Sequence, residues 1–100
     1  MAYRALEKLI NLHDGYRKVV SLAGRQALLL QENGTPRLID RHCPHAGQVL
    51  DAASVSGDVL TCPKHAMQFS LHDGRVPYGA CAPLVVHTLV YEGNSLGIDE

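Results

Sequence analysis

The fold is decided by two stretches of the chain, Cys43-Pro44-His45 and Cys62-Pro63-Lys64-His65. Each stretch supplies one cysteine and one histidine, and positions 46–61 separate the two. Thiolates and imidazoles are the side chains that bind zinc and iron most readily in proteins. The pattern therefore predicts a metal site with four ligands, Cys43, His45, Cys62 and His65.

The even division of ligand types between the two stretches points to a 2Fe–2S cluster, one per chain, in which histidines replace two of the usual four cysteines. With two ferric ions, two sulfides and two thiolates, the charges of the oxidised cluster sum to zero. A neutral centre takes up an electron more easily than an anionic one, so such clusters have higher potentials than all-cysteine clusters. A structural zinc ion is the alternative, although zinc sites favour wider spacing than Cys-x-His.

Length and composition favour a small globular protein. The chain has 100 residues, 46% of them hydrophobic, and a net charge of −1, which argues against electrostatic binding of nucleic acid. No apolar run is long enough to cross a membrane, and no long apolar leader segment begins the chain. Two of the three cysteines are expected to bind metal, which leaves no pair for a disulfide. We therefore expect a single domain, 1–100, in the cytoplasm.

The pattern before the first cysteine is typical of β structure. Residues 17–22 and 36–40 are expected strands, and the apolar run 26–31 favours a buried strand over a helix because it is short. Asn33-Gly34 is a strong hairpin signal, since both residues tolerate positive φ. Only the first dozen residues could hold a helical turn.

The second half of the chain continues the pattern. Residues 59–61 form an expected short strand, and the alternating apolar positions 67, 69 and 71 indicate a half-buried one. The segment 84–91 is rich in β-branched and aromatic residues, and a turn at 92–95 precedes a last strand at 96–98. These elements predict an all-β fold, an antiparallel β sandwich or barrel, with two ligand loops at about 42–48 and 62–67.

The segments CPHAGQVL (43–50) and CPKHAMQFSLHDG (62–74) closely resemble the two motifs of Rieske ferredoxins, and Phe69 and Gly74 fall at matching positions. The resemblance covers most of the chain. It implies that Cys43 and Cys62 bind one iron of the cluster, whereas His45 and His65 bind the other.

Departures from the high-potential members of that family are informative. Gln48 and Lys64 occupy the positions at which those proteins have disulfide cysteines, and Met67 and Phe69 occupy positions of hydroxyl side chains near the cluster. Fewer hydrogen bonds to the cluster sulfurs should lower the potential, so the chain resembles the low-potential, soluble branch. Gly79 replaces a proline that the family often has in a third loop, 77–83.

The resemblance implies a one-electron carrier that passes electrons from a flavin-containing reductase to a terminal oxygenase, such as a ring-hydroxylating dioxygenase. Such a carrier contacts its partners transiently and has no catalytic residue of its own, so the chain is expected not to be a stand-alone enzyme. The alternatives are the small Rieske subunit of an NADH-dependent nitrite reductase and a zinc-stabilised binding module without redox activity. His42 is expected to be exposed to solvent or to contact the ligands without binding metal itself, and Cys81 is expected to be a buried, inert thiol rather than a redox-sensitive thiol near the cluster.

Overall fold

The computed structural model describes residues 2–44, 47–63, 67–72, 74 and 83–99. These residues form short strands and one 3-10 turn, which confirms the all-β prediction. In chain order the elements are β1 (Tyr3–Lys8), η1 (Leu9–Asn11), β2 (Tyr16–Leu22), β3 (Arg25–Glu32), β4 (Thr35–Asp40), β5 (Ser54–Ser56), β6 (Val59–Thr61), β7 (Gln68–Ser70), β8 (Val86–His87), β9 (Val90–Glu92) and β10 (Ser95–Asp99).

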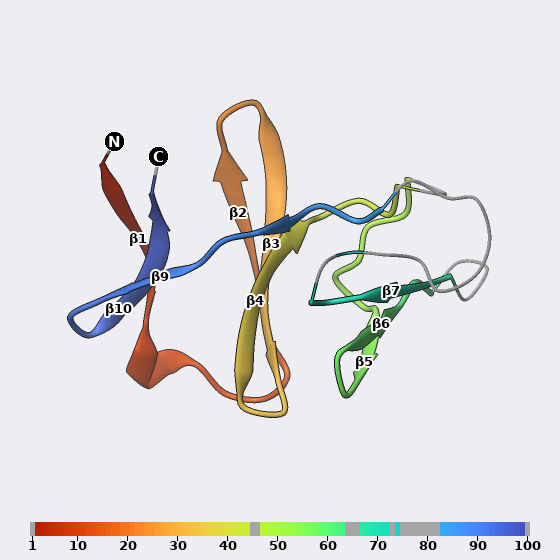
Figure 1. Ribbon diagram of the computed structural model, residues 1–100, viewed down its shortest axis with the longest axis horizontal. Coiled ribbons are helices and arrows are strands. Elements are labelled where there is room, and N and C mark those ends of the chain that lie inside the picture. Colours follow the sequence, from red (N-terminus) through yellow and green to blue (C-terminus); the bar gives the residue numbers. More distant parts are fainter. Residues whose placement is uncertain (1, 45–46, 64–66, 73, 75–82, 100) are drawn as a thin grey trace.

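The strands form three antiparallel sheets, which follow one another across the molecule (Figure 1). The terminal sheet has the order β1-β10-β9 and lies beside the two chain ends. The base sheet, β2-β3-β4-β8, stands in the middle, and the loop sheet, β5-β6-β7, lies on the side away from the termini. The ligand motifs adjoin the loop sheet, because Cys62 directly follows β6.

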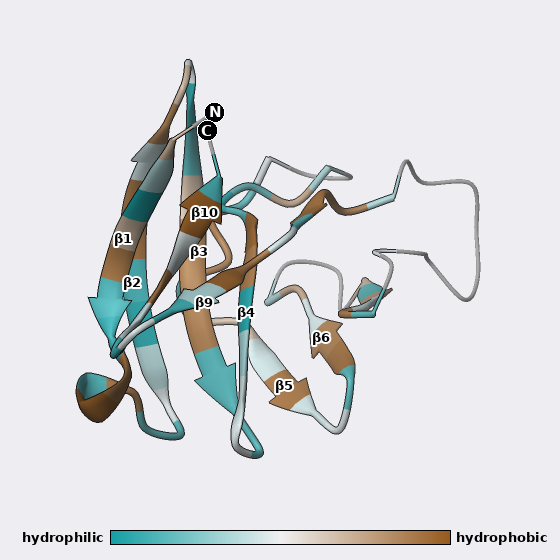
Figure 2. Cartoon of the chain, turned by 60° about the vertical axis from the view of Figure 1, so that its left-hand side comes forward, coloured by the Kyte–Doolittle hydropathy of each residue, from teal (hydrophilic) through white to brown (hydrophobic). Residues whose placement is uncertain are grey.

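Strand β3 separates two apolar cores, and its hydrophobic middle is brown in Figure 2. Residues 27–30 are all buried, as expected for a strand covered on both faces. Successive side chains of a strand point to opposite faces, so alternate residues of β3 enter different cores. The base core contains Leu6, Val20, Ala27, Leu29, Leu38, Leu96 and Ile98. The loop core contains Leu28, Leu30, Ile39, Cys43, Leu50, Ala53, Leu60, Cys62, Phe69, Leu71 and Leu84.

Several sequence predictions are confirmed. The run 26–31 is a strand, and Asn33-Gly34 forms the β3–β4 turn with positive φ at both residues, +52° and +74°. Residues 59–61 form β6, and Phe69 and Leu71 are buried, whereas Gln68, directly before Phe69, is exposed. The turn at 93–94 joins β9 to the last strand, β10.

Three features of the structure differ from what the sequence indicates. Residues 3–8 are strand β1, because they pair with β10 from the other end of the chain, and the helical turn considered for the first dozen residues is limited to η1. Strand β5 was not foreseen. The segment 84–91 is divided into β8, which pairs with β4, and β9, which pairs with β10, because the chain crosses between two sheets there.

In the part of the chain that the structure describes, no helix has the length and apolar character needed to cross a membrane.

Candidate metal centre

Cys43 begins the first ligand loop at the edge of the loop core, where it is 1% exposed. Its N–H donates to the carbonyl of Gln48 over 2.8 Å, and its own carbonyl accepts from the N–H of Gly47 over 2.7 Å. Gly47 has φ +68°, a conformation that costs glycine little, so the chain can turn tightly there. His42, which pairs with Val49 across the base of this loop, is exposed as predicted.

Cys62 occupies the corresponding position in the second loop. It follows β6 directly and is fully buried, and its N–H donates to the carbonyl of Met67 over 2.8 Å. In both loops, therefore, a buried cysteine donates to the carbonyl five residues later. The next residue in each case, Pro44 or Pro63, is exposed, so the chain emerges from the core directly after the cysteine.

The two cysteines belong to the same core, although 18 residues separate them in the sequence, at positions 44–61. Two thiols held at the starts of matching loops and shielded by apolar side chains suit the sulfur-ligated half of a 2Fe–2S cluster, because thiolate is its preferred ligand. The other two predicted ligands, His45 and His65, lie outside the described residues, as do Ala46, Lys64, Ala66 and Cys81. The described residues contain no group of three or more His, Cys, Asp and Glu side chains able to hold a metal ion.

A pair of opposite charges closes the base of the first loop. Nε and Nη2 of Arg41 donate to the two carboxylate oxygens of Asp51, each over 3.0 Å, and the N–H of Leu50 donates to the carbonyl of Arg41 over 2.8 Å. Hydrogen bonding by Arg41 holds the pKa of Asp51 below its usual value, so the carboxylate is charged at neutral pH. Sequence reasoning missed this pair, although opposite charges on either side of the first motif were a visible signal.

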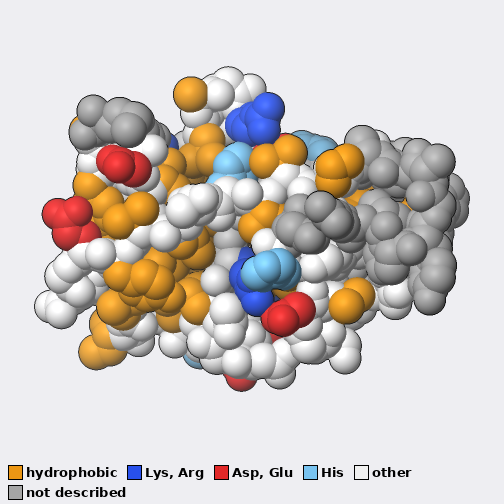
Figure 3. Space-filling view, viewed as in Figure 1, with side chains coloured by type: hydrophobic (Ala, Val, Ile, Leu, Met, Phe, Trp, Pro, Cys, Tyr) orange, Lys and Arg blue, Asp and Glu red, His pale blue; other side chains and the backbone are white. Residues whose placement is uncertain are grey.

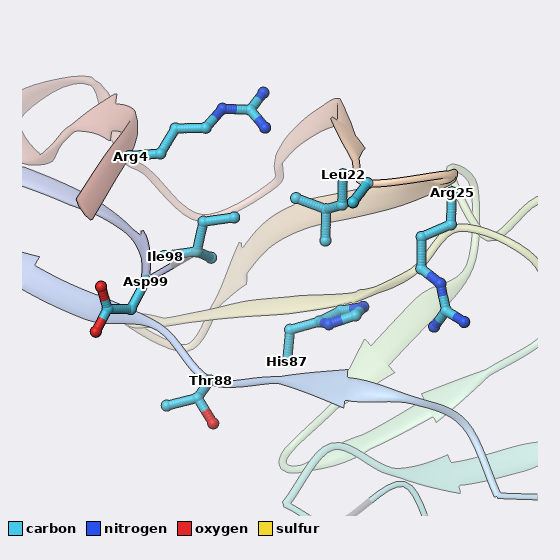
Figure 4. A pocket seen from close by; sticks show the side chains of 8 residues that line it. Arg4, Leu22, Arg25, His87, Thr88, Ile98 and Asp99 are labelled. Atoms are coloured by element: carbon cyan, nitrogen blue, oxygen red, sulfur yellow. The ribbon is translucent and has the colours of Figure 1, made fainter. Parts of the chain in front are cut away.

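A surface pocket of about 760 Å³ lies away from both cysteines, between the terminal and base sheets. Figure 4 shows Arg4 on one side of it and His87 and Arg25 on the other. Asp40 already contacts two of these groups, since its carboxylate lies 2.8 Å from Nε2 of His87 and 3.3 Å from Nη1 of Arg25. The pocket lining includes Arg4, Arg25 and Asp99 but neither cysteine, so we do not assign it to the metal centre.

The family model for the Rieske [2Fe-2S] domain matches residues 4–88 of the chain. The chain belongs to this family. A Rieske domain carries a 2Fe–2S cluster, so the cofactor predicted from the sequence is confirmed at the level of the family, and a zinc site is not favoured.

Three known proteins illustrate the similarity of this Rieske domain to others. It is 33% identical over 81 residues to cholesterol 7-desaturase nvd 2 of Ciona intestinalis, a match that includes 75% of the chain but only 18% of that longer protein. The fold is that of the ferredoxin of carbazole 1,9a-dioxygenase from Nocardioides aromaticivorans IC177, with a TM-score of 0.80, 19% identity and coverage of 97% and 96% of the two chains. The Sphingomonas yanoikuyae B1 ferredoxin gives a TM-score of 0.83, with 20% identity and 99% coverage of both chains.

Proposed function

We propose that residues 1–100 form one Rieske domain that acts as a one-electron carrier, with Cys43, His45, Cys62 and His65 holding the 2Fe–2S cluster. The observation that carries this proposal is the matching pair of loops, each beginning with a buried cysteine in the loop core. When bound, such a cluster accepts and releases one electron at a time. We propose no catalytic residue in this chain, which would make it a component of an oxidoreductase system rather than a stand-alone catalyst.

The partners we propose are a flavin-containing reductase, which supplies the electron, and a terminal oxygenase, which receives it. Support comes from the near-complete match in fold to the ferredoxin of carbazole 1,9a-dioxygenase. The face shown in Figure 3 carries both acidic and basic side chains. We do not propose nucleic acid as a partner, because the net charge of the chain is −1. The cytoplasm is the proposed compartment, because its reducing environment keeps ligand thiols available.

The chain's own residues favour electron exchange at the histidine side of the cluster. Cys43 and Cys62 close one side of the site to water, whereas Pro44 and Pro63 are exposed and lead directly into the histidine positions. A partner that docks on these loops would approach the proposed histidine ligands and not the buried cysteines. Such a contact can be small and transient, as weak electron-transfer complexes are.

The cofactor proposal is tested by analysis of protein purified without oxygen. About two irons and two acid-labile sulfides per chain are expected, with a Rieske-type EPR signal after reduction. Replacing either proposed histidine with cysteine (His45→Cys or His65→Cys) should lower the potential or abolish cluster binding, because it adds negative charge or misplaces a ligand. Stoichiometric zinc after anaerobic reconstitution with iron and sulfide would contradict the proposal.

The docking proposal is tested by stopped-flow reduction with a competent flavin reductase at several ionic strengths. Ala46→Glu or Ala66→Glu should slow electron transfer and leave the spectrum nearly unchanged, since no proposed ligand is altered. Lys64→Glu should mainly change the association rate and its salt dependence. Arg25→Glu, which alters a residue of β3 on the base sheet, is the control. Wild-type rates in the loop variants together with slow transfer in the control would place the docking surface elsewhere.

A further inference from the structure

Both proposed ligand loops are the tips of hairpin-like segments whose roots meet the same strand. The first segment is rooted at Arg41, whose carbonyl accepts the N–H of Leu50. The second is the β6–β7 hairpin, and at its root the N–H of Leu71 donates to the carbonyl of Asp58 over 2.7 Å. Both roots are contacted by arginine side chains of one short stretch, Arg37 in β4 and Arg41 directly after its end.

Arg37, within β4, holds the root of the second hairpin. Its Nη1 donates to the carbonyl of Leu71 over 3.0 Å, and its Nη2 donates to a carboxylate oxygen of Asp58 over 2.7 Å. The guanidinium therefore contacts both ends of the hairpin. The Arg37 side chain is 20% exposed, so its hydrogen bonds are partly shielded from water.

Arg41, four residues further along, holds the root of the first segment through its two hydrogen bonds to Asp51. It also continues the β3–β4 ladder, because its N–H donates to the carbonyl of Gln26 over 3.1 Å. Positions 37, 39 and 41 of an extended strand lie on one face. Ile39, between the two arginines, belongs to the loop core that contains both cysteines.

We propose that Arg37 and Arg41 are positioning residues that set the relative placement of the two proposed ligand loops from one side of β4 and of the residue that follows it. This inference rests on the proposed cluster site. A cluster bridged between two loops requires all four ligand atoms at fixed separations, and a rigid strand anchoring both loop roots provides them. Loss of either anchor should let one loop shift against the other.

The test compares three holoprotein variants, Arg37→Met, Arg41→Met and the control Arg25→Met. Methionine keeps an unbranched apolar stem and removes the charge and the donors. Arg25 is a matched control because it too forms an ion pair, 3.3 Å from Asp40, but this pair lies within the base sheet, and among the described residues its hydrogen bonds go to Asp40 and not to a loop root. Cluster loss to a chelator should be about three- to tenfold faster for Arg37→Met and Arg41→Met, and near the wild-type rate for the control.

EPR of the reduced protein separates positioning from general destabilisation. A shift of the loops should broaden or move the signal of the cluster that remains bound, whereas lower stability alone would reduce its intensity without changing its shape. Two further variants, Asp51→Asn and Asp58→Asn, keep the arginines and weaken only the groups that accept their hydrogen bonds. They should change the rate of cluster release and the EPR signal in the same direction as the arginine variants, but by less.

Two results would overturn the inference, and they are distinguishable. If wild-type protein binds a cluster while the Arg37 and Arg41 variants match the Arg25→Met control in release rate and EPR shape, the anchors do not position the loops and the cluster site stands. If wild-type protein binds no iron and sulfide, the proposed site fails and the inference fails with it.

Discussion

Gly74 allows a close approach of two backbone segments, so Gly74→Ala should be severely destabilising. Its φ is +78°, and a Cβ added there would lie 1.8 Å from the carbonyl oxygen of Leu84. The N–H of Leu84 donates to the Gly74 carbonyl over 2.8 Å, and the Leu84 side chain is buried in the loop core. An alanine must therefore displace backbone rather than a flexible side chain.

The cost follows from three contributions. Positive φ costs an alanine about 1–2 kcal/mol, of which some tenths are offset by lower entropy of the unfolded chain. Loss of the Leu84 hydrogen bond adds about 1 kcal/mol. Partial withdrawal of the Leu84 side chain from the core adds about 1–2 kcal/mol. Gly74→Ala should thus lower the free energy of unfolding by about 3–4 kcal/mol.

Gly93→Ala is the matched control, because Gly93 also has positive φ, +59°, but nothing lies within 4 Å of its added Cβ. It should cost about 1 kcal/mol. Urea unfolding followed by far-UV circular dichroism measures both variants. With a slope of about 1–2 kcal/mol per molar urea, the Gly74 variant should unfold at least about 1 M below the Gly93 variant. Equal midpoints would refute the close-contact argument.

Three further predictions concern stability and potential. Hydrogen bonds from Asn11 and other groups lower the pKa of Glu7 from 4.5 to about 2. The charged carboxylate therefore stabilises the fold fully above about pH 4.5, and this stabilisation is lost as the pH falls toward 2. In urea unfolding, Glu7→Gln should be less stable than the wild type at pH 6, and the difference in free energy of unfolding should shrink as the pH is lowered. Phe69→Ala, in the core, should cost about 3–5 kcal/mol in urea unfolding, whereas Tyr91→Ala, at a site 60% exposed, should cost about 0.5 kcal/mol or less. Protein-film voltammetry should give a potential on the order of −150 mV, because Met67 and Phe69 offer no hydroxyl, and a value above about +100 mV would contradict the low-potential assignment.

The sequence predicted the elements whose determinants are local. Asn33-Gly34 specifies a tight hairpin through its own backbone preferences, and the run 27–30 is apolar because both faces of β3 are covered. Strand β1 escaped prediction because its partner, β10, lies at the other end of the chain. No pattern within residues 3–8 encodes that pairing, so a reading of local propensity had no means of finding it.

The candidate site shows the same division. Cys43 and Cys62 could be predicted as ligands because each lies close to a histidine in the sequence. The structure places both cysteines in one core. The anchors at Arg37 and Arg41 were not foreseen, because their acceptors lie 10 to 34 residues further along the chain. Charged residues in a strand ordinarily indicate a solvent-facing side. Only the folded chain shows that these two arginines end on carbonyl and carboxylate groups of the ligand hairpins.

The structure explains what Gly74 and Phe69 do in the fold, which their match to the motif alone does not. Phe69 fills the loop core beside both cysteines, and Gly74 lets the chain at Leu84 close over the same core. Neither residue is a proposed ligand. Both contribute to the packing around the cysteine ends of the two loops, whereas Arg37 and Arg41 bond to groups at the loop roots. Residues of the motif that are not proposed ligands thus belong to the core that holds both cysteines, so a change in that packing is expected to affect both proposed ligand loops.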